Sequence, residues 1–283
     1  MTPLLDRRLL LGLAGVLATA PTAAFSAALV PPPSDSQAAP VAVAFGPDPL
    51  QAYDLYPGLA TGPVLLFVHG GGWARGQRSM VNALPDYCRR HHFTLASTGY
   101  RLVPAVSARE EAEDVAAAVA SLKSQLPGRP IFLLGHSAGA HLAALIGIDP
   151  VYLGAHGLTP VDIAGVILLD GAGYDATLPR GPGFVGQVLE GMYDRAFGDQ
   201  RARLSPLKRI LAGQAYPPFL IFHIASRADS TAQSEALQQA LVQVGGQAEV
   251  AVADDTHMSI NRGFGRGGDP EGERSATFIA MHA

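Results

Sequence analysis

One short turn constrains this chain more than any other feature. The pentapeptide Gly135-His136-Ser137-Ala138-Gly139 lies between an apolar run, residues 131–134, and a helix-forming run, residues 138–146. A sharp strand-to-helix turn strains the serine backbone, and glycines on either side remove the Cβ atoms that would collide there. The pattern therefore predicts that the Ser137 hydroxyl is exposed at the end of a strand, as a nucleophile. Taken alone, it also fits an ordinary glycine-rich turn with a capping serine.

A second glycine-rich motif, His69-Gly70-Gly71-Gly72-Trp73, directly follows the apolar, β-rich run Val64–Val68. Backbone N–H groups hold a negative oxygen only where the chain approaches it closely, and glycine permits that approach. We expect the N–H groups of Gly71, Gly72 and Ala138 to form such an oxyanion hole, with the histidine of the motif ordering the loop. Two such motifs in this order favour a hydrolase over two unrelated glycine turns.

A serine nucleophile needs a histidine as general base and a carboxylate that orients the histidine. In hydrolases of this pattern the chain order is Ser, then Asp or Glu, then His. Only His257 and His282 follow the last expected strand, residues 247–253, and His282 is the penultimate residue, where chains fray. His257 is therefore the expected base. His141, one helical turn after the nucleophile, is expected to pack against the nucleophile helix.

The carboxylate has two candidates. Asp229 follows the expected strand at residues 218–224, whereas Asp170 follows the expected strand at residues 163–169. We favour Asp229, because its loop is adjacent to the last strand, and keep Asp170 as the alternative. Asp170 would otherwise be a turn or pocket residue.

Short apolar runs alternate with longer amphipathic ones, which is typical of a mostly parallel sheet flanked by helices, an α/β fold. Strands are expected at residues 64–68, 93–97, 131–134, 163–169, 218–224 and 247–253, and helices at residues 79–91, 108–125, 138–146, 233–244 and 275–282. Residues 41–45 and 51–56 suit a leading hairpin. The Gly- and Pro-rich segment 171–209 suggests a small lid or pocket wall. Trp73 either borders the pocket, as a substrate-binding residue, or belongs to the core.

The N-terminal segment has the features of a targeting signal. Arg7 and Arg8 precede an apolar run, residues 9–20, with small residues after it that offer cleavage sites, as in a secretory signal peptide. The paired arginines resemble a twin-arginine signal. We therefore expect residues 1–30 to be a signal peptide, residues 31–40 a proline-rich linker, and residues 41–283 the catalytic domain of a periplasmic or secreted protein.

Composition excludes several classes of protein. Of 283 residues, 48% are hydrophobic and 16% charged, which indicates a globular protein, not a disordered one. The formal net charge of −4 lacks the basic excess of a nucleic-acid-binding protein. Cys88 is the only cysteine, so no intramolecular disulfide and no cysteine-based metal site can form.

Five segments together resemble the α/β-hydrolase esterases and lipases, in the branch related to hormone-sensitive lipase, which includes arylformamidase-like members. They are HGGGW (residues 69–73), TGYRLVP (98–104), GHSAGAHLAAL (135–145), LDGAGYD (169–175) and PPFLIFHIASRAD (217–229). The resemblance spans most of residues 63–263. It implies Ser137, Asp229 and His257 as the catalytic triad. The residues just before Asp229 and His257 depart from the usual glycine-containing versions.

These observations predict a serine carboxylesterase that acts on small or short-acyl esters through an acyl-enzyme. The alternatives are an arylformamidase-type amide hydrolase and an esterase that removes acetyl or feruloyl groups from polysaccharide. We expect no metal or organic cofactor. The expected partner is a small-molecule ester, with no nucleic acid and no membrane-spanning segment once the signal is cleaved.

Overall fold

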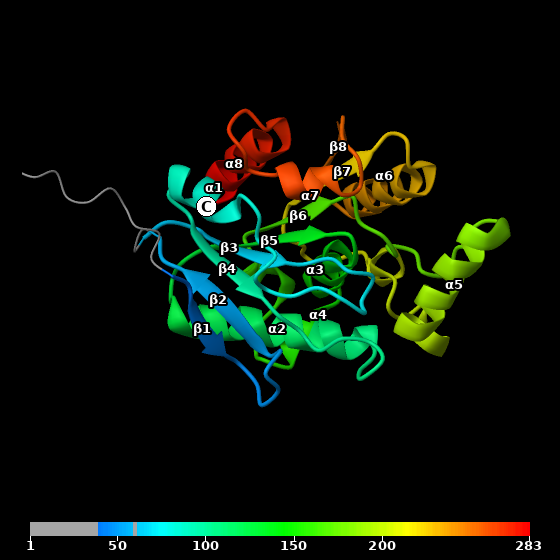
Figure 1. The fold of residues 1–283 in the computed structure, drawn as a ribbon, viewed down its shortest axis with the longest axis horizontal. Helices are drawn as coiled ribbons and strands as arrows, with labels where there is room; N and C mark the ends of the chain where they lie inside the picture. Colours follow the sequence, from blue (N-terminus) through cyan, green and yellow to red (C-terminus); the bar gives the residue numbers. More distant parts are fainter. Residues whose placement is uncertain (1–38, 59–60) are drawn as a thin grey trace, which may run out of the picture. The chain divides into compact units, whose positions relative to one another are not determined.

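The computed structural model describes residues 39–58 and 61–283, so the expected signal peptide and residues 31–38 of the expected linker lie outside the described residues. The described residues form one compact unit. Its eight strands make one sheet in the order β1-β2-β4-β3-β5-β6-β7-β8 (Figure 1). The strands are β1 Val41–Ala44, β2 Ala52–Tyr56, β3 Val64–Val68, β4 Thr94–Thr98, β5 Ile131–His136, β6 Gly165–Leu169, β7 Phe219–Ile224 and β8 Ala248–Ala253.

The six strands from β3 onward are parallel, whereas β1 and β2 pair antiparallel and β2 adds antiparallel to β4. The leading hairpin expected from the sequence is confirmed, and it occupies one edge of the sheet. Because the central strands are parallel, their carboxyl ends lie along one edge, where α/β folds bind ligands. β5, β6 and β7 are consecutive neighbours there, so the residues that follow them lie close together.

The helices are α1 Leu84–Arg90, α2 Ala108–Gln125, α3 Ala138–Ile148, α4 Pro150–Gly154, α5 Gly183–Phe197, α6 Ala228–Gln243, α7 Ser259–Gly263 and α8 Pro270–His282. Successive residues of β3 alternate between two apolar clusters, Leu66 in one and Leu65 and Phe67 in the other. The first cluster includes residues of α2, α3 and α6, and the second includes residues of α1, α7 and α8. Both faces of the sheet are therefore covered, which explains why the central strands are apolar throughout.

The structure confirms β3 and α2 residue for residue and shifts several other boundaries. The expected helix at residues 79–91 is reduced to α1, the expected helix at residues 233–244 begins at Ala228, and segment 171–209 contains α5. Earlier onset of α6 matters most, because it places Asp229 in the first turn of a helix. Within the described ranges, no helix is both long enough and apolar enough to span a bilayer.

Candidate active site

Ser137 occupies the tight turn between β5 and α3, with backbone angles φ 55° and ψ −119° that few non-glycine residues adopt. The glycines around it are sterically required. A Cβ on Gly139 would lie 2.1 Å from the Val68 carbonyl oxygen, and one on Gly135 would lie 2.5 Å from the Gly139 carbonyl oxygen. The turn predicted from the pentapeptide is thus confirmed, and neither glycine can be replaced without moving backbone.

A line of three side chains joins the ends of β5, β6 and β8. The Nε2 atom of His257 is 3.0 Å from Ser137 Oγ, and its Nδ1 atom is 2.5 Å from Asp170 Oδ2. His257 lies in the loop between β8 and α7, and Asp170 directly follows β6. Nucleophile, imidazole and carboxylate have the hydrogen-bonding order that acyl-transfer chemistry requires.

Asp229, the carboxylate favoured from the sequence, does not contact His257, and this preference is corrected. Asp229 is exposed in the first turn of α6 and lines the pocket, whereas Asp170 makes the hydrogen bond to the imidazole. The physical reason is the sheet order. β6 lies between β5 and β7, so a residue at the end of β6 is already beside the nucleophile strand, and the early start of α6 makes Asp229 an exposed residue of the first helical turn.

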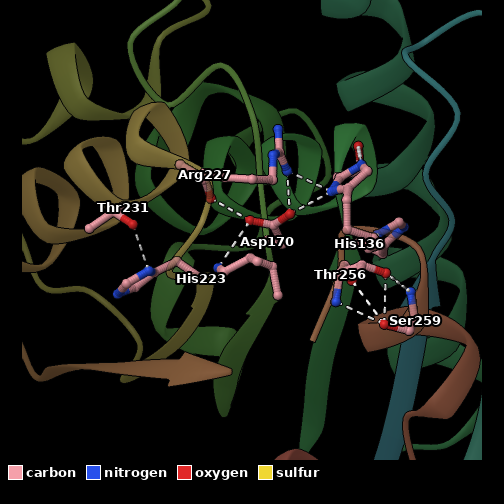
Figure 2. A network of polar contacts seen from close by, with 11 residues as sticks. His136, Asp170, His223, Arg227, Thr231, Thr256 and Ser259 are labelled. Carbon is pink, nitrogen blue, oxygen red and sulfur yellow. Dashed lines mark hydrogen bonds and ion pairs between the residues drawn. The ribbon is translucent and has the colours of Figure 1, made fainter. Parts of the chain in front are cut away.

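Asp170 is completely buried and is held as a carboxylate by its neighbours. Its Oδ1 accepts a hydrogen bond of 2.5 Å from Ser230 Oγ, and its Oδ2 is paired with the Arg227 guanidinium as well as with His257 (Figure 2). Burial raises the pKa of Asp170, but the hydrogen bonds from His257, Ser230 and Arg227 outweigh burial and lower the pKa to about 2. The group therefore stays charged at neutral pH and can stabilise a positive imidazolium.

Arg227 also approaches His257 directly, with Nη1 2.6 Å from Nδ1. A guanidinium only donates hydrogen bonds, so the arginine and the Asp170 carboxylate compete for opposite tautomers of the ring. When Nδ1 carries the proton and donates it to Asp170, Nε2 is free to accept the Ser137 proton. The buried anion favours this tautomer, and Arg227 then acts through its pairing with the carboxylate.

His136 supports the histidine loop from the nucleophile strand. Its Nε2 donates a 2.8 Å hydrogen bond to the His257 carbonyl oxygen, and the two rings lie 4.8 Å apart. Burial lowers the pKa of His136 to about 4, with the neighbouring His257 lowering it further, so His136 is a neutral tether at pH 7. Figure 2 shows its place near the Thr256–Ser259 turn, in which the Thr256 N–H donates to Ser259 Oγ at 2.8 Å.

The glycine loop after β3 lies against the same pocket. Gly71 and Gly72 have positive φ angles of 136° and 61°, and a Cβ on Gly71 would lie 1.9 Å from the Arg75 carbonyl oxygen. Ala138 is the first residue of α3, so its N–H is one of the four that a helix leaves without an intrahelical partner. Gly71 and Gly72 line the pocket, and the role of these three N–H groups as oxyanion donors stays a prediction.

His69 orders the loop, as expected. Its Nδ1 donates a 2.9 Å hydrogen bond to the Gly70 carbonyl oxygen, and its ring stacks on Tyr100 at 4.3 Å. The Tyr100 hydroxyl donates a 2.6 Å hydrogen bond to the His69 carbonyl oxygen. Burial lowers the pKa of His69 to about 4, against the effect of the hydrogen bond to Gly70, so the ring stays neutral.

Trp73 is a core residue and not a substrate-binding residue, which corrects the pocket assignment. Its side chain is fully buried, and its Nε1 donates a 3.2 Å hydrogen bond to His141 Nδ1. The ring also makes edge contacts with Tyr193 and Phe197 of α5. Trp73 thereby links α5 and α3 to the glycine loop, and His141, itself a residue of α3, contacts Trp73, Phe197 and the Leu204 carbonyl oxygen.

A pocket of about 550 Å³ opens above Ser137. Its lining includes the glycine loop and Ser137, and α5 contributes one wall through Leu189, Met192 and Tyr193. The expectation that segment 171–209 holds a pocket wall is therefore confirmed. Within the described part of the chain, no group of three or more His, Cys, Asp or Glu side chains is placed to hold a metal ion.

A family model described as alpha/beta hydrolase fold matches residues 65–259, more than half of the chain. The chain belongs to this family. The α/β-hydrolase fold and esterase resemblance expected from the sequence are thus confirmed.

Two solved structures show the same fold. Esterase B from Lactobacillus rhamnosis has a TM-score of 0.66 at 24% identity, covering 85% of this chain and 82% of that one. Thermogutta terrifontis esterase 2 has a TM-score of 0.65 at 20% identity, covering 87% and 94%.

Curated relatives match shorter parts of this α/β hydrolase. Esterase LipC of Mycobacterium tuberculosis is 29% identical over 64% of this chain and 49% of its own. A probable isoprenylcysteine alpha-carbonyl methylesterase of Arabidopsis thaliana is 31% identical over 38% and 25%, and a kynurenine formamidase of Meyerozyma guilliermondii is 36% identical over 29% and 32%. The matches thus span between a quarter and a half of these relatives.

Sequence reasoning missed Arg227 and His136 as parts of the site. His136 had a signal, because it directly precedes the nucleophile on a buried strand. Arg227 had none, because its position depends on where α6 begins.

The low pKa of Asp170 predicts a specific acid sensitivity. A carboxylate whose pKa falls from 3.8 to about 2 on folding stabilises the protein above about pH 4 and loses that effect as the pH falls toward 2. The free energy of unfolding should therefore fall more steeply for the wild type than for Asp170→Asn between about pH 5 and pH 2, by about 2 kcal/mol. Urea unfolding over this range measures the difference, and parallel curves would contradict the assignment.

Proposed function

We propose that this α/β hydrolase cleaves carboxylic esters of small or short-acyl substrates through an acyl-enzyme. The observation that carries the proposal is the hydrogen-bonded line Ser137–His257–Asp170, at 3.0 and 2.5 Å, at the floor of a pocket next to the glycine loop. A nucleophile, a base and a buried anion in this order are the arrangement that activates a serine hydroxyl at neutral pH in many serine hydrolases.

In the proposed mechanism, His257 Nε2 takes the proton of Ser137 as Oγ attacks the ester carbonyl carbon. Asp170 keeps Nδ1 protonated and stabilises the imidazolium that forms. The N–H groups of Gly71, Gly72 and Ala138 bind the negative oxygen of the tetrahedral intermediate. His257 returns its proton to the departing alkoxide, and water then cleaves the acyl-enzyme by the same sequence of proton transfers.

Relatives support the ester and the short acyl group. Esterase B has been solved with a tributyrin phosphonate inhibitor, and Thermogutta terrifontis esterase 2 with propionate and with butyrate. The pocket volume of about 550 Å³ and the apolar side chains of Leu189 and Met192 suit a chain of this size.

A formamide substrate is the second candidate, because the match to a kynurenine formamidase at 36% identity is the highest of the relatives described above. The same triad and oxyanion donors would serve an amide bond. The leaving nitrogen of an amide must be protonated, and His257 would supply that proton.

We also propose that the protein is exported, from Arg7, Arg8 and the apolar run that follows them. N-terminal sequencing of protein recovered from outside the inner membrane tests this proposal. An uncleaved protein confined to the cytoplasm would contradict it.

Removal of the Ser137 hydroxyl should abolish ester turnover. Ser137→Ala should lower kcat for 4-nitrophenyl butyrate by about 10⁶-fold and prevent covalent labelling by a fluorophosphonate, because no nucleophile remains. Mass spectrometry of the labelled wild type should place the adduct on Ser137. Labelling of the Ala variant to the wild-type level would refute the proposed function.

The two carboxylate variants should differ sharply. Asp170→Asn should lower kcat by about 10⁴-fold, because an asparagine donates to Nδ1 and favours the wrong tautomer. Asp229→Asn should change kcat by less than about tenfold, since it touches no member of the triad. Both are measured with 4-nitrophenyl butyrate after urea unfolding has shown that the variants are folded. The reverse order of effects would restore Asp229 as the acid.

Parallel assays with a butyrate ester and with N-formylkynurenine distinguish the two candidate substrates. We expect the ester to have the higher kcat/KM, because the structurally similar esterases share most of this chain. A higher kcat/KM for the formamide would assign the protein to amide hydrolysis.

A further inference from the structure

The lining of the pocket at Ser137 contains more positive charge than ester hydrolysis requires. Three arginines line it, Arg75, Arg180 and Arg227, against one carboxylate, that of Asp229. Arg227 is already paired with Asp170. Within residues 39–58 and 61–283, Arg75 and Arg180 form no ion pair. Two arginines of the pocket lining are therefore without a protein counter-ion among the described residues.

Arg180 is held in place although it has no carboxylate partner. Its Nε donates a 2.9 Å hydrogen bond to the Leu178 carbonyl oxygen, and its Nη2 donates a 3.2 Å hydrogen bond to the Asp175 carbonyl oxygen. Its guanidinium carbon lies 4.2 Å above the centre of the Tyr193 ring. The side chain is thus fixed by neutral groups, and a cation fixed in advance loses little entropy when it binds an anion.

Arg75 and Arg180 belong to different parts of the pocket lining, Arg75 beside the glycine loop and Arg180 beside Tyr193 of α5. A Cβ on Gly71 would lie 1.9 Å from the Arg75 carbonyl oxygen, and the Arg180 guanidinium lies over the ring of Tyr193, the residue that follows Met192. Arg180 is therefore placed at the wall that α5 gives to the pocket, where the acyl or alcohol part of a bound ester can lie. This wall is apolar, formed by residues such as Leu189 and Met192.

We propose that the substrates of this enzyme are esters that carry an anionic group, a carboxylate, in the part of the molecule that lies between Ser137 and α5. The proposal rests on the proposed ester hydrolysis and names its substrate class. Arg180 holds the carboxylate, Arg75 adds attraction from the glycine-loop side, and Asp229 opposes it. Charge-assisted hydrogen bonds in a partly enclosed pocket are strong enough to set such a preference.

Two matched pairs of substrates test the proposal on either side of the scissile bond. One pair is 4-nitrophenyl hydrogen adipate and its methyl ester, and the other is 4-acetoxybenzoate and its methyl ester. In each pair the ratio of kcat/KM for the acid to kcat/KM for the methyl ester is measured, following release of the phenol. Comparison of this ratio between wild type and variant cancels the intrinsic reactivity of the two esters.

In at least one pair, Arg180→Met should lower the ratio by roughly tenfold or more, as expected for loss of a hydrogen bond between charged groups. Arg75→Met should lower it less, because that side chain is exposed. Asp229→Asn should raise it, since the one opposing charge is removed. Arg195→Met, on the same helix as the wall but outside the pocket, is the control and should leave the ratio unchanged.

If Arg180→Met fails to fold, Arg75→Met and Asp229→Asn still decide the test, because they are expected to change the kcat/KM ratio in opposite directions. The preference should also weaken with added salt in the wild type. Ratios that none of the charge variants shifts in either pair would overturn the inference while leaving ester hydrolysis intact. Absence of turnover for every ester, together with an unlabelled Ser137, would instead refute the proposed function.

Discussion

The hydrogen bond between His257 and the buried Asp170 carboxylate is the interaction on which the site depends. It joins the end of β6 to the loop after β8, two segments separated by 87 residues, and leaves Nε2 facing Ser137. An unpaired carboxylate at this depth would be costly, so the anion is tolerated only because Ser230, Arg227 and the imidazole all donate to it. The hydrogen-bond donors that converge on Asp170 therefore do two things. They make burial of its charge possible, and they align His257 with Ser137.

Much of the fold followed from the sequence because its signals are local. The five apolar residues of β3 define a buried strand without help from distant contacts. The structure adds a further local signal for α2, the capping box of Ser107 and Glu110. Ser137 was identified for the same reason, since a glycine-flanked serine between a strand and a helix has few structural explanations. His257 followed from the order of residues along the chain.

The acid could not be fixed in this way. Asp170 and Asp229 both follow strands that reach the same edge of the sheet, and only three-dimensional facts separate them. These facts are that β6 lies next to β5 and that α6 begins at Ala228. The role of Trp73 was open for a related reason, because a tryptophan beside a glycine loop can face either side of it. The hydrogen bond from its indole to His141 shows that it faces the core.

Helix α5 contains both buried residues that anchor it and residues that remain exposed. Tyr193 and Phe197 anchor it to Trp73, while Phe184 and Val185 remain largely exposed, with relative accessibilities of 80% and 70%. In Figure 1 the helix stands apart from the sheet. Ser137, His257 and Asp170 come from β5, the loop after β8 and the end of β6, so mutations of the half-buried wall residues Leu189 and Met192 would change which molecules are accepted at a smaller cost in stability than mutations of the buried Tyr193 and Phe197. New substrate selectivity in this chain would thus evolve through substitutions in the α5 wall of the pocket. Such substitutions would leave Ser137, His257 and Asp170 in place.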